Sequence, residues 1–165
     1  MVITPEHVQY AGFWRRLLAT LIDSLLYAVI IYLAIYLLYG ADYFTWAKEN
    51  SEPFAFYGMG DMVLNNFAPI VVTIFFWLKF MGTPGKLLLG CHVVDATTFA
   101  PLRPGQAILR YFAYLVSILP LGLGFLWIIW DRRKQSFHDK IARSVVIMED
   151  ETHEVFTELT QEPPR

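Results

Sequence analysis

The sequence contains a single cysteine, Cys91, among its 165 residues. One thiol excludes an internal disulfide and any metal cluster built from cysteines. The chain also lacks a phosphate-binding loop, a nucleophile elbow and a catalytic pair of carboxylates at a recognisable spacing, and it has no strongly basic region of the kind that binds nucleic acid. We therefore expect a protein that is not an enzyme, holds no metal or cofactor and does not bind nucleic acid.

Charged residues are scarce and apolar residues are abundant. Charged residues make up 17% of the chain, whereas 56% of the residues are hydrophobic and 16% are aromatic. Soluble domains contain about 45–50% apolar residues. The composition therefore indicates an integral membrane protein, and the length leaves room for one small membrane domain.

Three apolar stretches are long enough to be membrane segments. The first two, at about 15–39 and 62–81, match the roughly 20 residues that cross a bilayer. Two asparagines and a proline near the start of the second stretch predict an irregular outer end. The third stretch, at about 107–130, has the sequence PLGLG at its middle. It therefore forms either one long third span or a helical hairpin that re-enters the side of the membrane from which it started.

Lysine and arginine are distributed unevenly around these stretches. They are in excess in 1–16, 79–106 and 131–143, whereas the 40–61 loop has four acidic residues and one lysine. Because cytoplasmic loops are enriched in Lys and Arg, we expect both termini and the 79–106 loop to be cytoplasmic. This placement favours the hairpin over a third crossing. The candidates for contact with anionic membrane lipids are Arg132, Arg133 and Lys134.

Short β-branched runs predict a small sheet beside the membrane segments. The runs are at 89–95, 98–103 and 144–148, and we expect them to form a three-stranded cytoplasmic sheet. The predicted fold class is an all-α membrane protein, with two transmembrane helices plus a helical hairpin, to which this small cytoplasmic β-sheet is added. The acidic tail, 149–165, is predicted to be disordered.

One carboxylate lies inside the first apolar stretch. Asp23 follows Arg16 by about two helical turns, which places both side chains on nearly the same face of a helix. A carboxylate near the bilayer centre costs about 3 kcal/mol or more unless it has a partner, a proton or water. Asp23 is therefore a candidate ion or proton site, with Thr73, at a similar depth, as a candidate oxygen ligand. Alternatively, Asp23 is structural and is satisfied by Arg16, by Arg110 or by a helix N-terminus.

Several motifs occur in a fixed order along the chain. They are GFWRRLLATLID at 12–23, TPGK at 83–86, VVD at 93–95 and FHDKIARSVV at 137–146. Together they resemble the RDD family of small membrane proteins, over about residues 10–148. That family is named for an arginine at the start of its first helix, an aspartate within that helix and a second aspartate. Arg16 and Asp23 match the first two, and the second aspartate falls on Asp139 or on Asp131.

The resemblance implies a multi-pass protein of the bacterial inner membrane, with a membrane domain over residues 1–148. It also implies a transporter-type function, because some members are linked to sodium–proton exchange. Asp23 would then bind protons and monovalent cations in turn. Arg16 would either pair with Asp139 as a latch at the cytoplasmic entrance or extend to a lipid phosphate. From its residue type, His138, beside Asp139, is a candidate pH sensor; the alternative is an ordinary polar residue at the membrane interface.

One copy of so short a chain encloses little volume for a transport pathway, so we expect a homo-oligomer. The alternative function is a protein that does not transport but binds membrane lipids, or assists membrane assembly, through its basic cytoplasmic surface.

Overall fold

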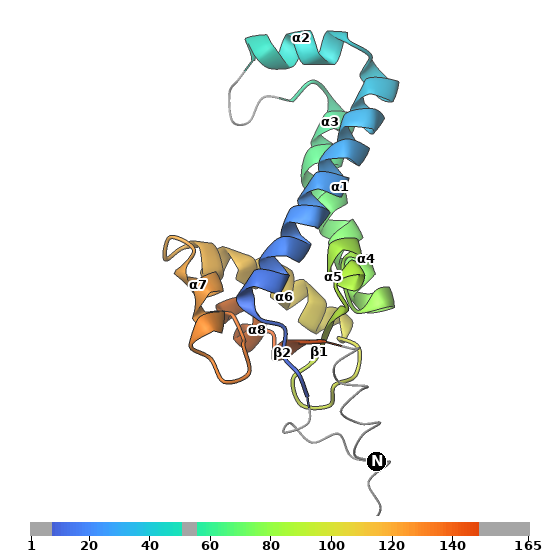
Figure 1. The fold of residues 1–165 in the computed structure, drawn as a ribbon. Coiled ribbons are helices and arrows are strands. Elements are labelled where there is room, and N and C mark those ends of the chain that lie inside the picture. The colour runs from blue at the N-terminus through green and yellow to red at the C-terminus, as the bar shows by residue number, and fades with distance from the viewer. Residues whose placement is uncertain (1–7, 51–55, 149–165) are drawn as a thin grey trace, which may run out of the picture.

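The computed structural model describes residues 8–50 and 56–148 of the chain. Figure 1 shows a long arm of two helical segments that run side by side, with a smaller body of short helices and a sheet at one end of the arm. The predicted disordered tail at 149–165 lies outside the described residues. In chain order the elements are α1 (Phe13–Tyr39), α2 (Asp42–Glu49), α3 (Met59–Met62), η2 (Val63–Phe67), α4 (Ala68–Phe80), α5 (Pro84–Leu88), β1 (Cys91–Asp95), α6 (Pro104–Ile118), α7 (Leu123–Leu126), η3 (Trp127–Ile129), α8 (Phe137–Ile141) and β2 (Ser144–Met148).

Two helical segments have the length and composition to cross a membrane. They are Phe13–Tyr39, with 27 residues, and Met59–Leu88, with 30 residues, and only 6% of the most apolar window of each is buried inside the protein. Large apolar side chains cover their outer faces, as expected for helices whose surroundings are lipid tails. The two predicted spans are therefore confirmed as helices of spanning length.

The start of the second span is irregular, as predicted. The chain between α3 and α4 forms a π-helical turn, η2, and Pro69 follows in the first turn of α4. Proline has no backbone N–H and disrupts the helical hydrogen-bond ladder on its N-terminal side, which explains a local change of helix type there. Asp61, which is 3% exposed, accepts hydrogen bonds from the Tyr43 hydroxyl at 2.7 Å and the Asn65 amide at 2.6 Å. These bonds fix α2 to this end of the arm.

The third apolar stretch forms two short helical segments joined by a sharp bend. α6 meets the α7–η3 segment at an angle of 111°. Gly122 begins α7 with a left-handed φ of 81°, and a Cβ added to Gly124 would come within 2.5 Å of the Ser117 Cα. Glycine is therefore required at both the turn and the contact between the two arms. The described part of the chain has two candidate spans, or three if this bent pair counts as one.

The sheet has two strands rather than the three predicted. β1 and β2 pair antiparallel, from Cys91 opposite Met148 to Asp95 opposite Ser144, which confirms the predicted pairing of these runs. The expected strand at 98–103 is wrong, because that segment adds a single bridge between Val94 and Pro101. Proline cannot donate to a ladder, and Asp95 Oδ1 accepts the backbone N–H groups of residues 97 and 98, which closes a turn instead.

The free edge of β2 is covered by the segment just before α1. Tyr10 bridges to Ile147, the Ala11 N–H donates to the Val146 carbonyl at 2.9 Å, and the Met148 N–H donates to the Gln9 carbonyl at 2.9 Å. The chain before α1, the chain after α4 and the last described strand therefore meet at one end of the arm (Figure 1). The main buried cluster, which includes Trp77 of α4, lies between this sheet and the helices.

Candidate functional site

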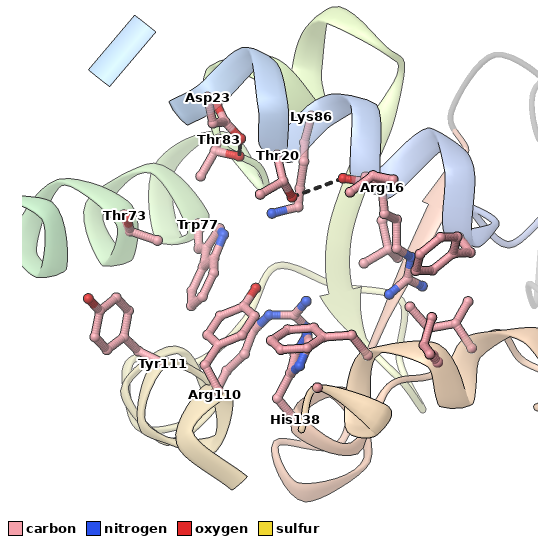
Figure 2. A pocket seen from close by; sticks show the side chains of 18 residues that line it. Arg16, Thr20, Asp23, Thr73, Trp77, Thr83, Lys86, Arg110, Tyr111 and His138 are labelled. Carbon is pink, nitrogen blue, oxygen red and sulfur yellow. Dashed lines mark hydrogen bonds between the residues drawn. The ribbon is translucent and has the colours of Figure 1, made fainter. Parts of the chain in front are cut away.

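A cavity of about 600 Å³ lies where the helical arm meets the body. Figure 2 shows its side chains converging from α1, α4, α5, α6 and α8. Its volume is typical of pockets that hold small ligands. Most of the wall is apolar or aromatic, and the polar side chains that line it are Arg16, Thr20, Asp23, Thr73, Thr83, Lys86, Arg110, Tyr111, Tyr114 and His138.

Two arginines from different helices share one buried carboxylate behind this cavity. Arg16 Nη1 lies 2.5 Å from Asp139 Oδ2, and Arg110 Nη1 lies 2.6 Å from Asp139 Oδ1. The Asp139 side chain is completely buried, and those of Arg16 and Arg110 are 9% and 1% exposed. Arg16 also donates to the backbone carbonyls of Ala11 at 2.9 Å and Lys134 at 2.7 Å. The cluster therefore joins α1, α6 and α8 around one negative charge.

Asp139 also caps the helix that carries it. Its Oδ2 accepts the backbone N–H of Ser136 at 3.0 Å, and the Ser136 side chain caps the N3 position in return, a reciprocal capping box at the start of α8. Burial alone would raise the pKa of Asp139, but Arg110 and Arg16 outweigh burial and hold that pKa well below its usual range. The carboxylate is therefore ionised at any physiological pH.

His138 is neutral, although it adjoins Asp139. Burial lowers its pKa to about 3, and the positive charges of Arg110, Arg16 and Lys86 lower it further against the opposing effect of Asp139. Its Nδ1 lies 3.1 Å from the Ser117 Oγ, and its ring stacks near Tyr114 at 4.0 Å between centroids. The lowered pKa does not favour the expected role of His138 as a pH sensor near neutrality, which stays a prediction.

Asp23 binds the start of α5 rather than Arg16. Its Oδ2 accepts the Thr83 hydroxyl at 2.5 Å, and its Oδ1 accepts the backbone N–H of Gly85 at 2.6 Å. A Cβ added to Gly85 would approach the Ala19 carbonyl oxygen to 2.3 Å, so only glycine lets α5 lie this close to α1. Of the structural alternatives considered for Asp23, the helix N-terminus fits the geometry.

The other predicted residues fall in different places. Thr73 lines the same cavity as Asp23. Asp131 forms an ion pair with Lys140 at the surface, far less buried than the pair made by Asp139. Within the cluster of candidate lipid contacts, Arg132 and Lys134 are exposed, whereas Arg133 packs on Tyr10 and donates to the Ala96 carbonyl.

Lys86 and Trp77 line the cavity and were not predicted as site residues. Lys86 is 7% exposed and has no salt bridge within residues 8–50 and 56–148; its ammonium lies 5.9 Å from the centre of the Trp77 ring. Arg110 lies against the same ring at 5.1 Å. The indole Nε1 of Trp77 and the Nε of Arg110 are both buried and have no hydrogen-bond acceptor in the described part of the chain. The wall of the cavity therefore contains two enclosed donors that lack acceptors in the described part of the chain.

Comparison with known proteins identifies the family of this chain. The model of the RDD family matches residues 10–143. The chain belongs to the RDD family. RDD proteins are small membrane proteins.

The relatives of this RDD chain carry little functional information in their names. The uncharacterized protein YxaI of Bacillus subtilis is 31% identical over 150 residues, which is 83% of this chain and 96% of the relative. A proline-rich antigen homolog of Mycobacterium tuberculosis is 33% identical over 63 residues, 38% of this chain and 26% of that protein. The uncharacterized protein RP437 of Rickettsia prowazekii is 38% identical over 74 residues, 45% of this chain and 40% of that protein. No solved structure gives a significant match.

Arg16, Asp23 and either candidate for the second family aspartate, Asp139 or Asp131, do not form one cluster in this chain. Arg16 and Asp139 make an ion pair, whereas Asp23 holds the TPGK segment at its threonine and glycine. A Ser-x-x-Asp spacing, which is a capping pattern, was a sequence signal for the structural part of the Asp139 role. Nothing in the sequence around Lys86 or Trp77 signalled their burial, because a lysine and a tryptophan at the end of a span also occur as ordinary interfacial residues.

Proposed function

We propose that this RDD protein binds an anionic, phosphate-bearing ligand in the 600 Å³ cavity at the cytoplasmic boundary of the membrane. The observation that carries the proposal is the charge balance. Among residues 8–50 and 56–148, Arg16, Lys86 and Arg110 line the cavity with positive charge and Asp23 alone with negative charge, and Asp139 is shared by the two arginines behind it. One positive charge is left without a carboxylate.

Lys86 is the residue whose charge is not balanced. A buried ammonium is costly unless it is paired and hydrogen-bonded, and in this chain its described neighbour is the face of Trp77. A cation–π contact contributes about 0.5–2 kcal/mol, which is less than the several kcal/mol that burial of an ion costs. An anion in the cavity would supply the missing partner and would also accept from Arg110.

The placement of the cavity suits a membrane ligand. We infer that the α6–α7 pair re-enters rather than crosses, because α6 and α8 pack together and both ends of the pair lie at the sheet end of the arm (Figure 1). The excess of Lys and Arg in the segments at this end favours the cytoplasmic side. The cavity would then lie at the level of lipid headgroups, where phosphate is abundant.

Cation–proton exchange through Asp23, the other predicted function, has less support. Both oxygens of Asp23 already accept hydrogen bonds, from Thr83 and from the Gly85 backbone, and a cation would compete with these donors. The cavity is also positive, which disfavours a metal cation. Sodium-dependent proton flux in proteoliposomes that is abolished by Asp23→Asn would restore this function.

Binding of a single-chain lipid to the full-length protein in detergent tests the proposal. Oleoyl lysophosphatidate carries a phosphate, and monooleoylglycerol has the same chain without it. Lys86→Met should weaken lysophosphatidate binding about tenfold or more, since a hydrogen bond to a charged group contributes about 1.5–3 kcal/mol. It should not change monooleoylglycerol binding.

Lys79→Met is the matched control. Lys79 carries the same charge on the same span, is exposed and lines neither described cavity. It should change neither affinity. Equal affinity of the unmodified protein for both lipids, or equal effects of Lys79→Met and Lys86→Met, would contradict the proposed function.

A further inference from the structure

A second, apolar cavity leads away from the first along the membrane arm. It has a volume of about 300 Å³ and lies between α1 and α4. Asp23, Thr73 and Thr83 line both cavities, so the two lie next to each other on either side of these side chains. Beyond this junction the walls are mainly apolar, and they are formed by Leu26, Tyr27, Ile30, Pro69, Val72 and Phe76.

The second cavity runs in the direction of the hydrocarbon core. From Asp23 to Ile30 the lining follows α1 for about 10 Å, at 1.5 Å per residue, away from the sheet and toward the middle of the arm. Walls that are mainly apolar in this position match an alkyl chain; the polar groups beyond the junction are the hydroxyls of Ser24 and Tyr27, and Tyr27 already donates to the Leu64 carbonyl at 2.8 Å.

The donors of the first cavity lie at the opposite end of this path. Trp77 Nε1 and Arg110 Nε are buried, each on a residue that is 1% exposed, and neither has an acceptor in the described part of the chain. Figure 2 shows Lys86, Trp77 and Arg110 around the same open space, with Thr73 toward the α4 side. Buried N–H groups are nearly always hydrogen-bonded in proteins, so these two unpaired N–H groups, beside the Lys86 ammonium, favour a multivalent acceptor such as phosphate.

We propose that the ligand is a phosphate-bearing amphiphile whose headgroup contacts Lys86, Arg110 and Trp77 and whose alkyl chain passes Thr73 into the groove between α1 and α4. This inference rests on the proposed function, because it names the class of ligand that the same cavity binds. The alkyl chain of the ligand enters the groove past Asp23, whose carboxylate is already bound by Thr83 and Gly85. The phosphate stays near the cationic side chains of the first cavity.

The chemistry separates this ligand from a soluble phosphate. A soluble phosphate would use the donors and leave the groove unused, whereas an amphiphile would use both cavities. An ordinary lipid of the surrounding bilayer would occupy the outer surface of the groove without needing the phosphate donors.

The experiment compares glycerol 3-phosphate, which is a headgroup alone, with oleoyl lysophosphatidate on the full-length protein in one detergent. Val72→Trp places bulk in the groove and does not touch the first cavity, while Val71→Trp adds the same bulk at a neighbouring position that lines neither cavity. Because each variant is compared with the unmodified protein in the same detergent, partitioning of the lipid into micelles cancels.

We expect Val72→Trp to weaken lysophosphatidate binding about tenfold and to leave glycerol 3-phosphate binding within about twofold. Val71→Trp should change neither affinity. Ile30→Trp, on the opposite wall of the groove, should weaken lysophosphatidate binding to the same extent as Val72→Trp. It replaces Val72→Trp in the experiment if that variant does not give a folded protein by size-exclusion chromatography.

A failure of this inference can be told apart from a failure of the proposed function. If both groove variants bind lysophosphatidate normally while Lys86→Met does not, the alkyl chain of the lipid does not lie in the groove. The inference is then wrong and the proposed function stands. If lysophosphatidate binds equally well to Lys86→Met and to both groove variants, the lipid is only part of the surrounding lipid layer, and both the inference and the proposed function are wrong.

Discussion

Replacing the buried Asp139 by asparagine should destabilise the protein strongly. The Asp139 carboxylate is 0% exposed and contacts two guanidinium groups, at 2.5 and 2.6 Å. Asparagine keeps an acceptor for the Ser136 N–H, so the α8 cap is largely retained and the loss is mainly one of charge. Removing one partner of a buried ion pair costs about 3–5 kcal/mol, and here two cations lose their partner. We therefore expect a loss of about 3–5 kcal/mol or more in the free energy of unfolding.

Asp131→Asn is the matched control for this change. Asp131 is also an ion-paired aspartate of the segment after the hairpin, but its side chain is 14% exposed and that of its partner Lys140 is 42% exposed. Exposed pairs contribute about 0–1 kcal/mol. The two variants should therefore differ by at least about 2 kcal/mol, or more than tenfold in the unfolding equilibrium constant.

Unfolding in mixed micelles, with sodium dodecyl sulfate as denaturant and circular dichroism as the signal, measures this difference. Adding Arg16→Met to Asp139→Asn should recover part of the lost stability, because it removes one uncompensated charge. If Asp139→Asn lay within about 1 kcal/mol of Asp131→Asn, the buried cluster would not hold the helices together as argued.

Three other predictions follow from local geometry. Gly85→Ala should lower the free energy of unfolding by about 1–3 kcal/mol, because the added Cβ would meet the α1 backbone. Gly105→Ala, with open space around it, should be neutral or slightly stabilising in the same unfolding assay. Equal effects of the two substitutions would contradict the close contact of α5 with α1. Burial lowers the pKa of His138 from 6.5 to about 3, so at pH values between these two the unfolded chain binds a proton that the native protein does not. The free energy of unfolding should therefore fall as the pH drops below about 6.5, by up to about 1.4 kcal/mol per pH unit. His138→Asn should flatten that slope. Cysteines placed at the exposed positions Lys48 and Arg132 should be labelled from opposite sides of the membrane, and labelling of both from outside intact cells would contradict the re-entrant hairpin.

The elements of the fold were largely predictable, because long apolar runs and β-branched runs are local signals. The first span begins within two residues of its predicted start, and the Ser144–Met148 strand pairs with β1 as expected. The segment at 98–103 was mispredicted because its β-branched character competes with Pro101 and with the turn closed by Asp95, and only the pairing geometry decides between them.

The candidate site was predictable only where two charges required each other. The resemblance to the family suggested the pairing of Arg16 with Asp139. It is physically reasonable because a buried arginine and a buried carboxylate each need a partner. The partners of Asp23 were not identified individually, because the contact depends on Gly85 approaching Ala19 across α1 and α5, more than sixty residues apart in the sequence. The burial of Lys86 depends on the same contact. A lysine after Pro-Gly carries no local sign that it faces a cavity.

The ion pair between Arg16 and Asp139 links residues that are 123 positions apart. At a synthesis rate of about 5–20 residues per second, Arg16 leaves the ribosome on the order of ten seconds before Asp139 exists. During that time the first helix must enter the membrane with an arginine at its base that has no native carboxylate to bind. Water, lipid phosphate or the insertion machinery must accept this charge until the last strand and α8 arrive, so the first helix of the protein reaches its native surroundings only when nearly the whole chain has been made.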